Sequence, residues 1–208
     1  MSKYHERPVF MGKYDNYKQL NENETKGKDY RTHFRHGKSG IVVLAPHGGG
    51  IEPGTTELAD AVAGNEHSFY SFDGLKKRGN SDLHITSRQF DEPIGTDIAK
   101  NSQTIVSMHG CKEKEKVVYI GGRDKSLKEK IKKALRRAGF SIKETPRFPG
   151  MHELNICNRS QTFKGVQLEI SMGLRRTMFQ DISRIKRKKT TKVFDKFVTA
   201  IRNASSDF

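Results

Sequence analysis

The chain has 208 residues, and its 39 lysines and arginines outnumber its 24 aspartates and glutamates, which gives a formal net charge of +15 at pH 7. This length suits one domain with small additions, and no apolar run approaches the roughly 18 residues of a membrane-spanning helix. The first residues lack the apolar centre of a secretory signal peptide, so we expect synthesis in the cytoplasm. The charge favours a polyanionic partner, such as nucleic acid, an anionic membrane or an acidic polymer, without distinguishing among them.

Basic residues gather in two places in the sequence. One is the run 186–189, Lys-Arg-Lys-Lys, and the other is a set of six lysines and arginines within 128–137. We interpret the second set as a solvated helix face. Cys111 and Cys157 form no CxxC pair, so a thiolate zinc site is not predicted and both are expected to be small buried side chains.

Apolar runs alternate with helical patterns along most of the chain. Residues 1–38 are polar and irregular, and we interpret them as an N-terminal polar arm with a surface helix around 14–21, followed by one domain over 39–208. Strands are predicted at 41–44, 67–72, 83–87, 104–108, 117–120 and 166–170, and helices at 55–63, 96–102, 127–138 and about 193–201. This order predicts a single-domain α/β fold with an open mixed, largely parallel sheet flanked by helices.

The clearest helix covers residues 127–138. Leu127, Ile131 and Leu135 keep helical spacing on one face. Ser126 and Glu129 have the spacing of a capping box, and the glycine that follows the helix supplies the stop.

The most informative stretch is residues 45–54, Ala-Pro-His-Gly-Gly-Gly-Ile-Glu-Pro-Gly, which follows the apolar strand 41–44. In open α/β sheets, ligands bind at the C-terminal ends of strands. His47 and Glu52 are both residues that zinc accepts, and the glycines allow them to reach one point. Two other interpretations stay open: a glycine turn without a ligand, and a phosphate-binding loop, although the P-loop lysine and the GxGxxG spacing are absent.

Two further predicted strands end in chemically capable residues. The run 104–108 closes on His109, which would lie at the same sheet edge as the glycine loop. His47, Glu52 and His109 then give the three protein ligands of a catalytic zinc, with the fourth position left for water. Glu169 lies within the apolar run 166–170, on the opposite face from its apolar neighbours, and is either a solvated edge residue or a general base.

Candidate substrate-binding residues follow from their hydrogen-bonding groups. Asn158 and Arg159 offer an amide and a planar guanidinium to a carboxylate, although an ordinary loop would have the same sequence. Arg88 is a further candidate for a carboxylate or an oxyanion, as are the neighbouring Arg175 and Arg176. His84 lies in a polar stretch, and we place it among residues that line the cleft or orient a ligand.

These residues resemble those of the zinc carboxypeptidase-like hydrolases, which use a His and a Glu from one loop, a second His after a strand, an Asn-Arg pair and a late Glu base. The common His-x-x-Glu spacing differs from that of His47 and Glu52, and Glu57 is the reserve ligand. A more specific resemblance covers residues 40 to about 171. The motifs 46–55, 72–74, 83–87, 90–91, 107–110 and 120–122, in this order, resemble the phage and Bacillus poly-γ-glutamate hydrolases.

The resemblance implies a monomeric zinc metallopeptidase, with one Zn2+ per chain, that cleaves the γ-glutamyl amide of capsular poly-γ-glutamate. Glu169 would be the base, and a bacteriophage enzyme of this kind would act outside the cell on the capsule after lysis. The polymer keeps a free α-carboxylate on each residue, which agrees with the basic charge. The alternatives are a zinc cell-wall amidase and a non-enzymatic nucleic-acid-binding protein. The second has no zinc finger, RNP aromatic motif or basic zipper to support it.

Overall fold

Seven strands form one mixed sheet in the computed structural model, which describes residues 12–183, 187 and 189–205. The sheet order is β1-β3-β2-β4-β7-β5-β6. The central strands β3, β2, β4 and β7 are parallel, β1 and β5 run antiparallel to their inner neighbours, and β6 is parallel to β5. The strand bounds are β1 Tyr30–Arg35, β2 Ile41–Gly49, β3 Ser68–Gly74, β4 Thr104–Cys111, β5 Val118–Gly121, β6 Ile142–Lys143 and β7 Gly165–Ser171.

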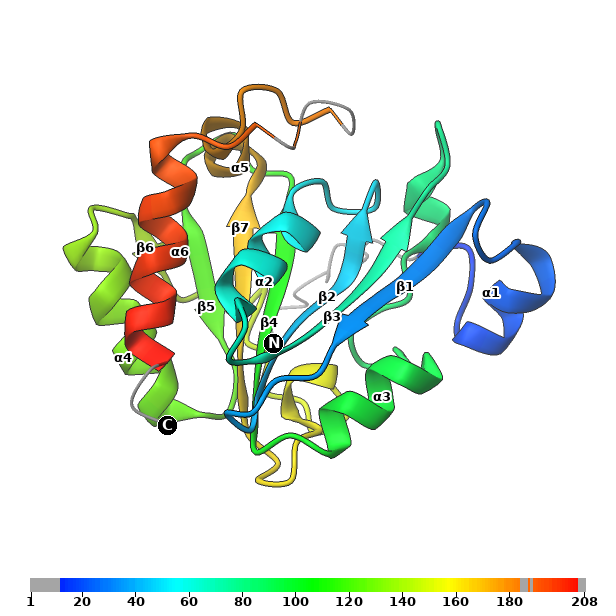
Figure 1. Ribbon diagram of the computed structural model, residues 1–208, viewed down its shortest axis with the longest axis horizontal. Helices are drawn as coiled ribbons and strands as arrows, with labels where there is room; N and C mark the ends of the chain where they lie inside the picture. Colours follow the sequence, from blue (N-terminus) through cyan, green and yellow to red (C-terminus); the bar gives the residue numbers. More distant parts are fainter. Residues whose placement is uncertain (1–11, 184–186, 188, 206–208) are drawn as a thin grey trace, which may run out of the picture.

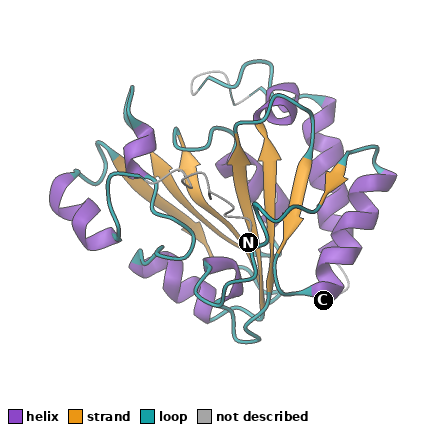
Figure 2. Cartoon of the chain, turned by 180° about the vertical axis from the view of Figure 1, so that it is seen from behind, coloured by secondary structure: helices purple, strands orange, loops and turns teal. Residues whose placement is uncertain are grey.

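Helices cover both faces of this sheet, giving three layers (Figures 1 and 2). One face packs against α2 (Thr55–Ala63), α4 (Lys125–Arg137), α5 (Met172–Met178) and α6 (Lys192–Ser205). The other carries α1 (Tyr17–Asn23), α3 (Pro93–Lys100) and the short 3-10 helices η1 (Asn80–Leu83) and η2 (Ile156–Asn158). No described helix is long and apolar enough to cross a membrane.

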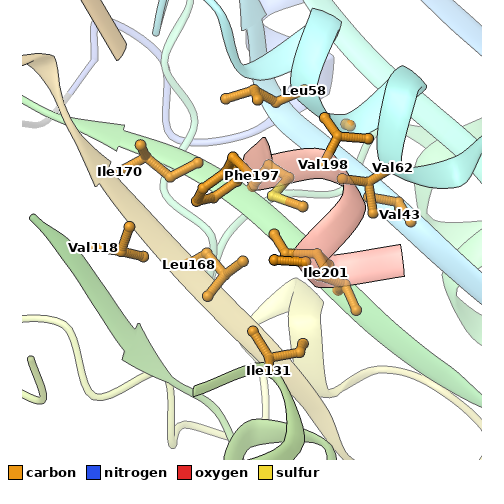
Figure 3. Packing of buried hydrophobic residues seen from close by; sticks show 14 of the residues in the cluster. Val43, Leu58, Val62, Val118, Ile131, Leu168, Ile170, Phe197, Val198 and Ile201 are labelled. Carbon is orange, nitrogen blue, oxygen red and sulfur yellow. The ribbon is translucent and has the colours of Figure 1, made fainter. Parts of the chain in front are cut away.

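Strand alternation decides which side chains enter each apolar core. Val106, Met108, Leu168 and Ile170 point towards α2, α4 and α6, and Figure 3 shows part of this larger cluster around Phe197. The intervening residues of the same strands face the other side of the sheet. On that other side the apolar cluster lies mainly under β2 and β3, so the faces of β4 and β7 are left for polar groups.

Most elements agree with the sequence prediction. The helix at 55–63 is confirmed in full, and the strands at 41–44, 104–108 and 166–170 are confirmed with extended ends. The predicted strand at 83–87 is wrong: its start belongs to η1, and no ladder partner pairs with it. The capping box is also wrong, because Asp124 caps α4 by accepting from the Leu127 N–H at 3.0 Å.

The amino-terminal segment is more ordered than the predicted polar arm. The surface helix is present as α1, but residues 30–35 form β1, which pairs along its length with β3. Leu20 and Tyr30 are fully buried in the second apolar cluster. The described part of this segment thus packs onto the sheet. Of the basic run 186–189, residues 186 and 188 lie outside the described residues.

Phe197→Ala should destabilise the protein by about 3–5 kcal/mol, because it removes a large side chain from the centre of the first cluster. Phe197 is 0% exposed and contacts Phe140 edge-to-face at 5.2 Å between ring centroids. Phe163, at 71% exposed, provides the matched control, and Phe163→Ala should change stability by less than about 0.5 kcal/mol. Urea unfolding followed by circular dichroism measures both, and equal effects would contradict this packing.

Candidate active site

The glycine loop after β2 brings an imidazole and a carboxylate together. The Glu52 N–H donates to the His47 carbonyl at 2.9 Å, which closes the turn, and the two side chains meet with His47 Nδ1 3.1 Å from Glu52 Oε1. A Cβ on Gly48 would lie only 2.1 Å from Ser71 Oγ, so this close approach to β3 requires glycine. Gly54, with φ of 98°, precedes α2 in a left-handed conformation that also favours glycine.

His109 joins this pair from the neighbouring strand β4. Its Nδ1 lies 3.1 Å from His47 Nδ1 and 3.8 Å from Glu52 Oε2. The next residue helps to hold the carboxylate, because the Gly110 N–H donates to Glu52 Oε2 at 2.8 Å. The structure therefore brings together the three residues predicted as metal ligands.

The hydrogen bonds of the two imidazoles determine where their lone pairs point. His47 Nε2 lies 2.7 Å from the Ile85 carbonyl oxygen, which can only accept, so this nitrogen carries the proton. In the neutral ring, the Nδ1 lone pair then faces Glu52 and His109. His109 Nε2 lies 2.8 Å from Ser107 Oγ, and when it donates there its Nδ1 lone pair faces His47.

This arrangement fits a metal ion. Two nitrogen lone pairs and a carboxylate oxygen that converge without a shared proton repel one another unless a cation lies between them. Ligands at about 2.0–2.1 Å from a tetrahedral zinc lie about 3.3 Å apart, close to the spacing seen here. The Ile85 carbonyl and the Ser107 hydroxyl would supply the outer hydrogen bonds that orient ligating histidines.

His84 also reaches this group, from the loop between η1 and α3. Its ring stacks on His47 at 3.8 Å between centroids, and its Nε2 lies 3.6 Å from Glu52 Oε1. His47, Glu52 and His84 each offer a ligand atom within 4.8 Å of the others, so His84 is a second candidate for the third ligand. The sequence prediction placed His84 among residues that line the cleft or orient a ligand, and not among the metal ligands themselves.

Glu169 lies beside His109 in the sheet. The two are direct partners in the β4–β7 ladder and share the face opposite the first core. Glu169 is buried, and its Oε1 accepts from Gln167 Nε2 at 3.4 Å, while Gln167 Oε1 accepts from Asn155 Nδ2 at 2.8 Å. Of the two sequence interpretations, a solvated edge residue is wrong, because β7 is an inner strand and this carboxyl is covered.

The shared environment shifts the pKa values of Glu169 and Glu52 in opposite directions. Burial raises the pKa of Glu169 well above its usual range, and the nearby Glu52 charge raises it further, while Arg175 opposes the shift. For Glu52, burial also favours the neutral acid, but the neighbouring histidines outweigh it and hold the pKa well below the usual range. Burial lowers the pKa of His109 to about 3, so its ring stays neutral, as a metal ligand must be.

Other predicted residues make structural contacts. The Arg159 guanidinium donates to the backbone carbonyls of Phe90 and Arg88, both at 2.7 Å, and Leu154, which ties two loops together. Asn158 Nδ2 donates to the Gly150 carbonyl at 2.7 Å. The described contacts place neither side chain in the histidine cluster, and carboxylate binding by either stays a prediction. Arg88 is exposed at the surface.

The remaining candidates do not join the histidine cluster. Glu57, the reserve ligand, pairs with Arg187 at 2.9 Å rather than with the histidines. Arg175 is fully buried and its guanidinium donates to three backbone carbonyls, so a direct contact with substrate or an oxyanion is wrong for this residue. Arg176, the next residue on α5, is exposed. The buried position of Arg175 could not be foreseen, because arginine is rarely fully buried.

The fold and the cluster together define an α/β protein with a candidate metal centre at the C-terminal edge of its sheet. The family model for poly-γ-glutamate hydrolase matches residues 14–200, so the chain belongs to the poly-γ-glutamate hydrolase family. The single-domain α/β fold predicted from the sequence is confirmed, with a mixed seven-stranded sheet.

Solved structures and curated relatives agree with this membership. A bacteriophage poly-γ-glutamate hydrolase superposes with a TM-score of 0.92 at 37% identity, covering 95% of this chain and 98% of the other. An apo, zinc-free structure of YndL gives a TM-score of 0.89 at 34% identity, covering 94% and 98%. The SPbeta prophage-derived protein YoqZ of Bacillus subtilis (strain 168) is 41% identical over 170 residues, which is 80% of this chain. The chain spans 61% of YoqZ and 66% of YndL from the same organism.

Glu169→Gln should stabilise the metal-free protein increasingly as pH rises. Because the folded state raises the pKa of Glu169, its contribution to stability is present below the unfolded value of about 4.3 and is lost as pH rises towards the folded value. The variant escapes this loss. Over the pH range in which the folded carboxyl is protonated and the unfolded carboxyl is ionised, the wild type loses about 1.4 kcal/mol of its free energy of unfolding per pH unit. The variant does not, so its advantage over the wild type should grow by the same amount.

Urea unfolding with a chelator present, at about pH 5 and about pH 8, measures this difference. The exposed Glu66 supplies the matched control, and Glu66→Gln should show no such trend. A gap between wild type and Glu169→Gln that stays constant with pH would show that Glu169 is ionised in the folded protein.

Proposed function

We propose that this protein is a zinc-dependent hydrolase that cleaves the γ-glutamyl amide bond of poly-γ-glutamate, with Glu169 as general base. The observation that carries the proposal is the convergence of His47 Nδ1, His109 Nδ1 and the Glu52 carboxylate, one strand away from a buried Glu169. Membership of the poly-γ-glutamate hydrolase family and the zinc-free description of the YndL structure support it.

His47, Glu52 and His109 would hold one zinc ion per chain. When bound, zinc supplies a Lewis acid that polarises the scissile carbonyl and lowers the pKa of water. Glu169 takes the proton of the attacking water and delivers it to the departing amine. The direction of its pKa shift, which burial raises, favours the step in which Glu169 holds the proton before delivering it to the amine.

The substrate class agrees with the charge of the protein. Poly-γ-glutamate keeps one free carboxylate per residue, so it is a polyanion, and a chain of net charge +15 would attract it. Screening by salt should weaken that attraction, since the Debye length is only about 8 Å at physiological ionic strength. We further propose a monomer, with neither membrane nor nucleic acid as its partner, that acts on capsule outside the cell after lysis.

Glu169→Gln should keep the metal and lose most turnover, because it removes the proton carrier while leaving the ligands in place. A loss of kcat on the order of 100-fold to 10,000-fold corresponds to removal of a general base. Polymer length measured by size-exclusion chromatography follows the reaction, and Glu66→Gln on the surface is the control. Normal shortening of the polymer by Glu169→Gln would reject the base assignment.

If the wild-type enzyme leaves the polymer intact, poly-γ-glutamate is not its substrate. The same preparation should then be assayed on peptidoglycan, which a cell-wall amidase would cleave. Absence of bound metal from that preparation would reject the zinc hydrolase altogether. Strongly salt-dependent binding to DNA would then identify a nucleic-acid-binding protein.

Single alanine variants distinguish the two candidates for the third ligand. His109→Ala should weaken zinc binding by on the order of 100-fold or more, while His84→Ala should retain about one zinc per chain. The exposed His33 on β1 offers a control, and His33→Ala should bind zinc as the wild type does. Metal analysis after dialysis measures all three. Zinc retained by His109→Ala and lost by His84→Ala would assign the third ligand to His84.

A further inference from the structure

Arg175 occupies an unusual position beneath the candidate metal centre. It lies on α5, directly after β7, and its side chain is 1% exposed, which makes it the largest fully buried side chain in the described part of the chain. Burying a guanidinium is costly unless its donors are satisfied and its charge is balanced. Here each of its three nitrogens donates to a backbone carbonyl, which indicates a specific role.

Its three donor nitrogens each bind the backbone of a different strand end. Nη1 donates to the Pro53 carbonyl at 2.5 Å, Nη2 to the Cys111 carbonyl at 2.9 Å, and Nε to the Ile170 carbonyl at 2.9 Å. These carbonyls belong to the loop after β2, the end of β4 and the end of β7. Pro53 directly follows Glu52, and Ile170 directly follows Glu169. Cys111 lies two residues after His109.

The guanidinium packs flat against the backbone beside His109. A Cβ on Gly110 would lie 2.5 Å from Arg175 Cζ, so no side chain fits between them. The same Gly110 donates its N–H to Glu52 Oε2 at 2.8 Å. The position of the guanidinium and the position of the Glu52 carboxylate are therefore linked through one residue.

Charge balance supports the same role. Burial lowers the pKa of the Arg175 guanidinium, and the nearby carboxylates of Glu52 and Glu169 oppose that shift by favouring the charged guanidinium. Arginine keeps its charge in a protein interior, where lysine readily loses its own. A fixed positive charge at this place offsets part of the repulsion between the two acids.

We propose that Arg175 is the positioning residue of the site, setting the distances among the glycine loop, β4 and β7 so that the metal ligands and the base face one point. It contacts neither substrate nor metal. This inference rests on the proposed function only for the identity of the metal, because the hydrogen bonds and the packing exist in the metal-free chain.

Arg175→Lys and Gly110→Ala test the role from two directions. Lysine keeps the cationic type of side chain but cannot span three carbonyls, and alanine at position 110 keeps the N–H and the arginine but displaces the guanidinium. Each should weaken zinc binding by roughly tenfold to 100-fold, the usual cost of disturbing groups that orient metal ligands. Cobalt substituted for zinc should show a changed visible spectrum in both variants.

Arg136→Met, which removes an exposed arginine from α4, is the matched control and should leave affinity and spectrum unchanged. A metal-free readout separates this inference from the proposed function. The Gly110 amide proton, which reports its hydrogen bond to Glu52, should shift in the NMR spectrum of chelator-treated Arg175→Lys. That shift supports the positioning role even if the wild type binds no zinc, a result that rejects only the proposed function.

Zinc affinity within twofold of wild type in both variants, together with an unmoved Gly110 amide, would overturn the positioning role. Circular dichroism and thermal unfolding of the metal-free variants identify misfolding. Should Arg175→Lys fail to fold, Gly110→Ala decides the matter, because it leaves every donor and charge of the site in the chain.

Discussion

The hydrogen bond between His47 Nε2 and the Ile85 carbonyl is the constraint on which the rest of the site depends. A carbonyl oxygen accepts and never donates, so this 2.7 Å contact fixes the proton on one nitrogen of His47 and leaves the lone pair of the other facing Glu52 and His109. Were the tautomer free to exchange, an N–H would point into the cluster for part of the time and compete with a cation. The loop that carries Ile85 thus orients a candidate metal ligand through its backbone.

The strands β3, β2, β4 and β7 are parallel, so their C-terminal ends lie at one edge of the sheet. This arrangement brings the site residues of separate strands together. Register then selects the side chains: His109 and Glu169 are ladder partners, and alternation turns both away from the large apolar cluster. The polar face they share is covered by the loop that carries Asn155, which keeps Glu169 buried. Burial raises the pKa of both carboxyl groups, but the histidines beside Glu52 outweigh it there and keep Glu52 ionised, whereas Glu169 favours its proton.

Sequence patterns predicted the sheet, the largest helices and the group of His47, Glu52 and His109, because strand ends and apolar periodicity are local signals. They missed β1, whose short alternation of Tyr30, Thr32 and Phe34 with basic residues lies in an otherwise polar segment, and they misread 83–87, whose start belongs to η1. The positions of His84 and Arg175 could not be predicted from local sequence for a related reason. His84 stacks on His47, and Arg175 binds backbone carbonyls from distant segments of the chain. The family resemblance identified the function class, while local spacing alone left a phosphate loop and an unliganded turn open.

The residues of the cluster are distant in sequence: His47 and His109 are 62 residues apart, and Ile85 lies 38 residues from His47. The pairing of β2 with β4 brings the two histidines together, and the loop that carries Ile85 packs against His47. Such non-local contacts form slowly during folding. The native state thus holds a preformed site that the unfolded chain lacks. By mass action, any cation that the site binds stabilises the fold in proportion to the logarithm of its free concentration. The concentration of such a cation in the surroundings would then influence how long the folded protein survives.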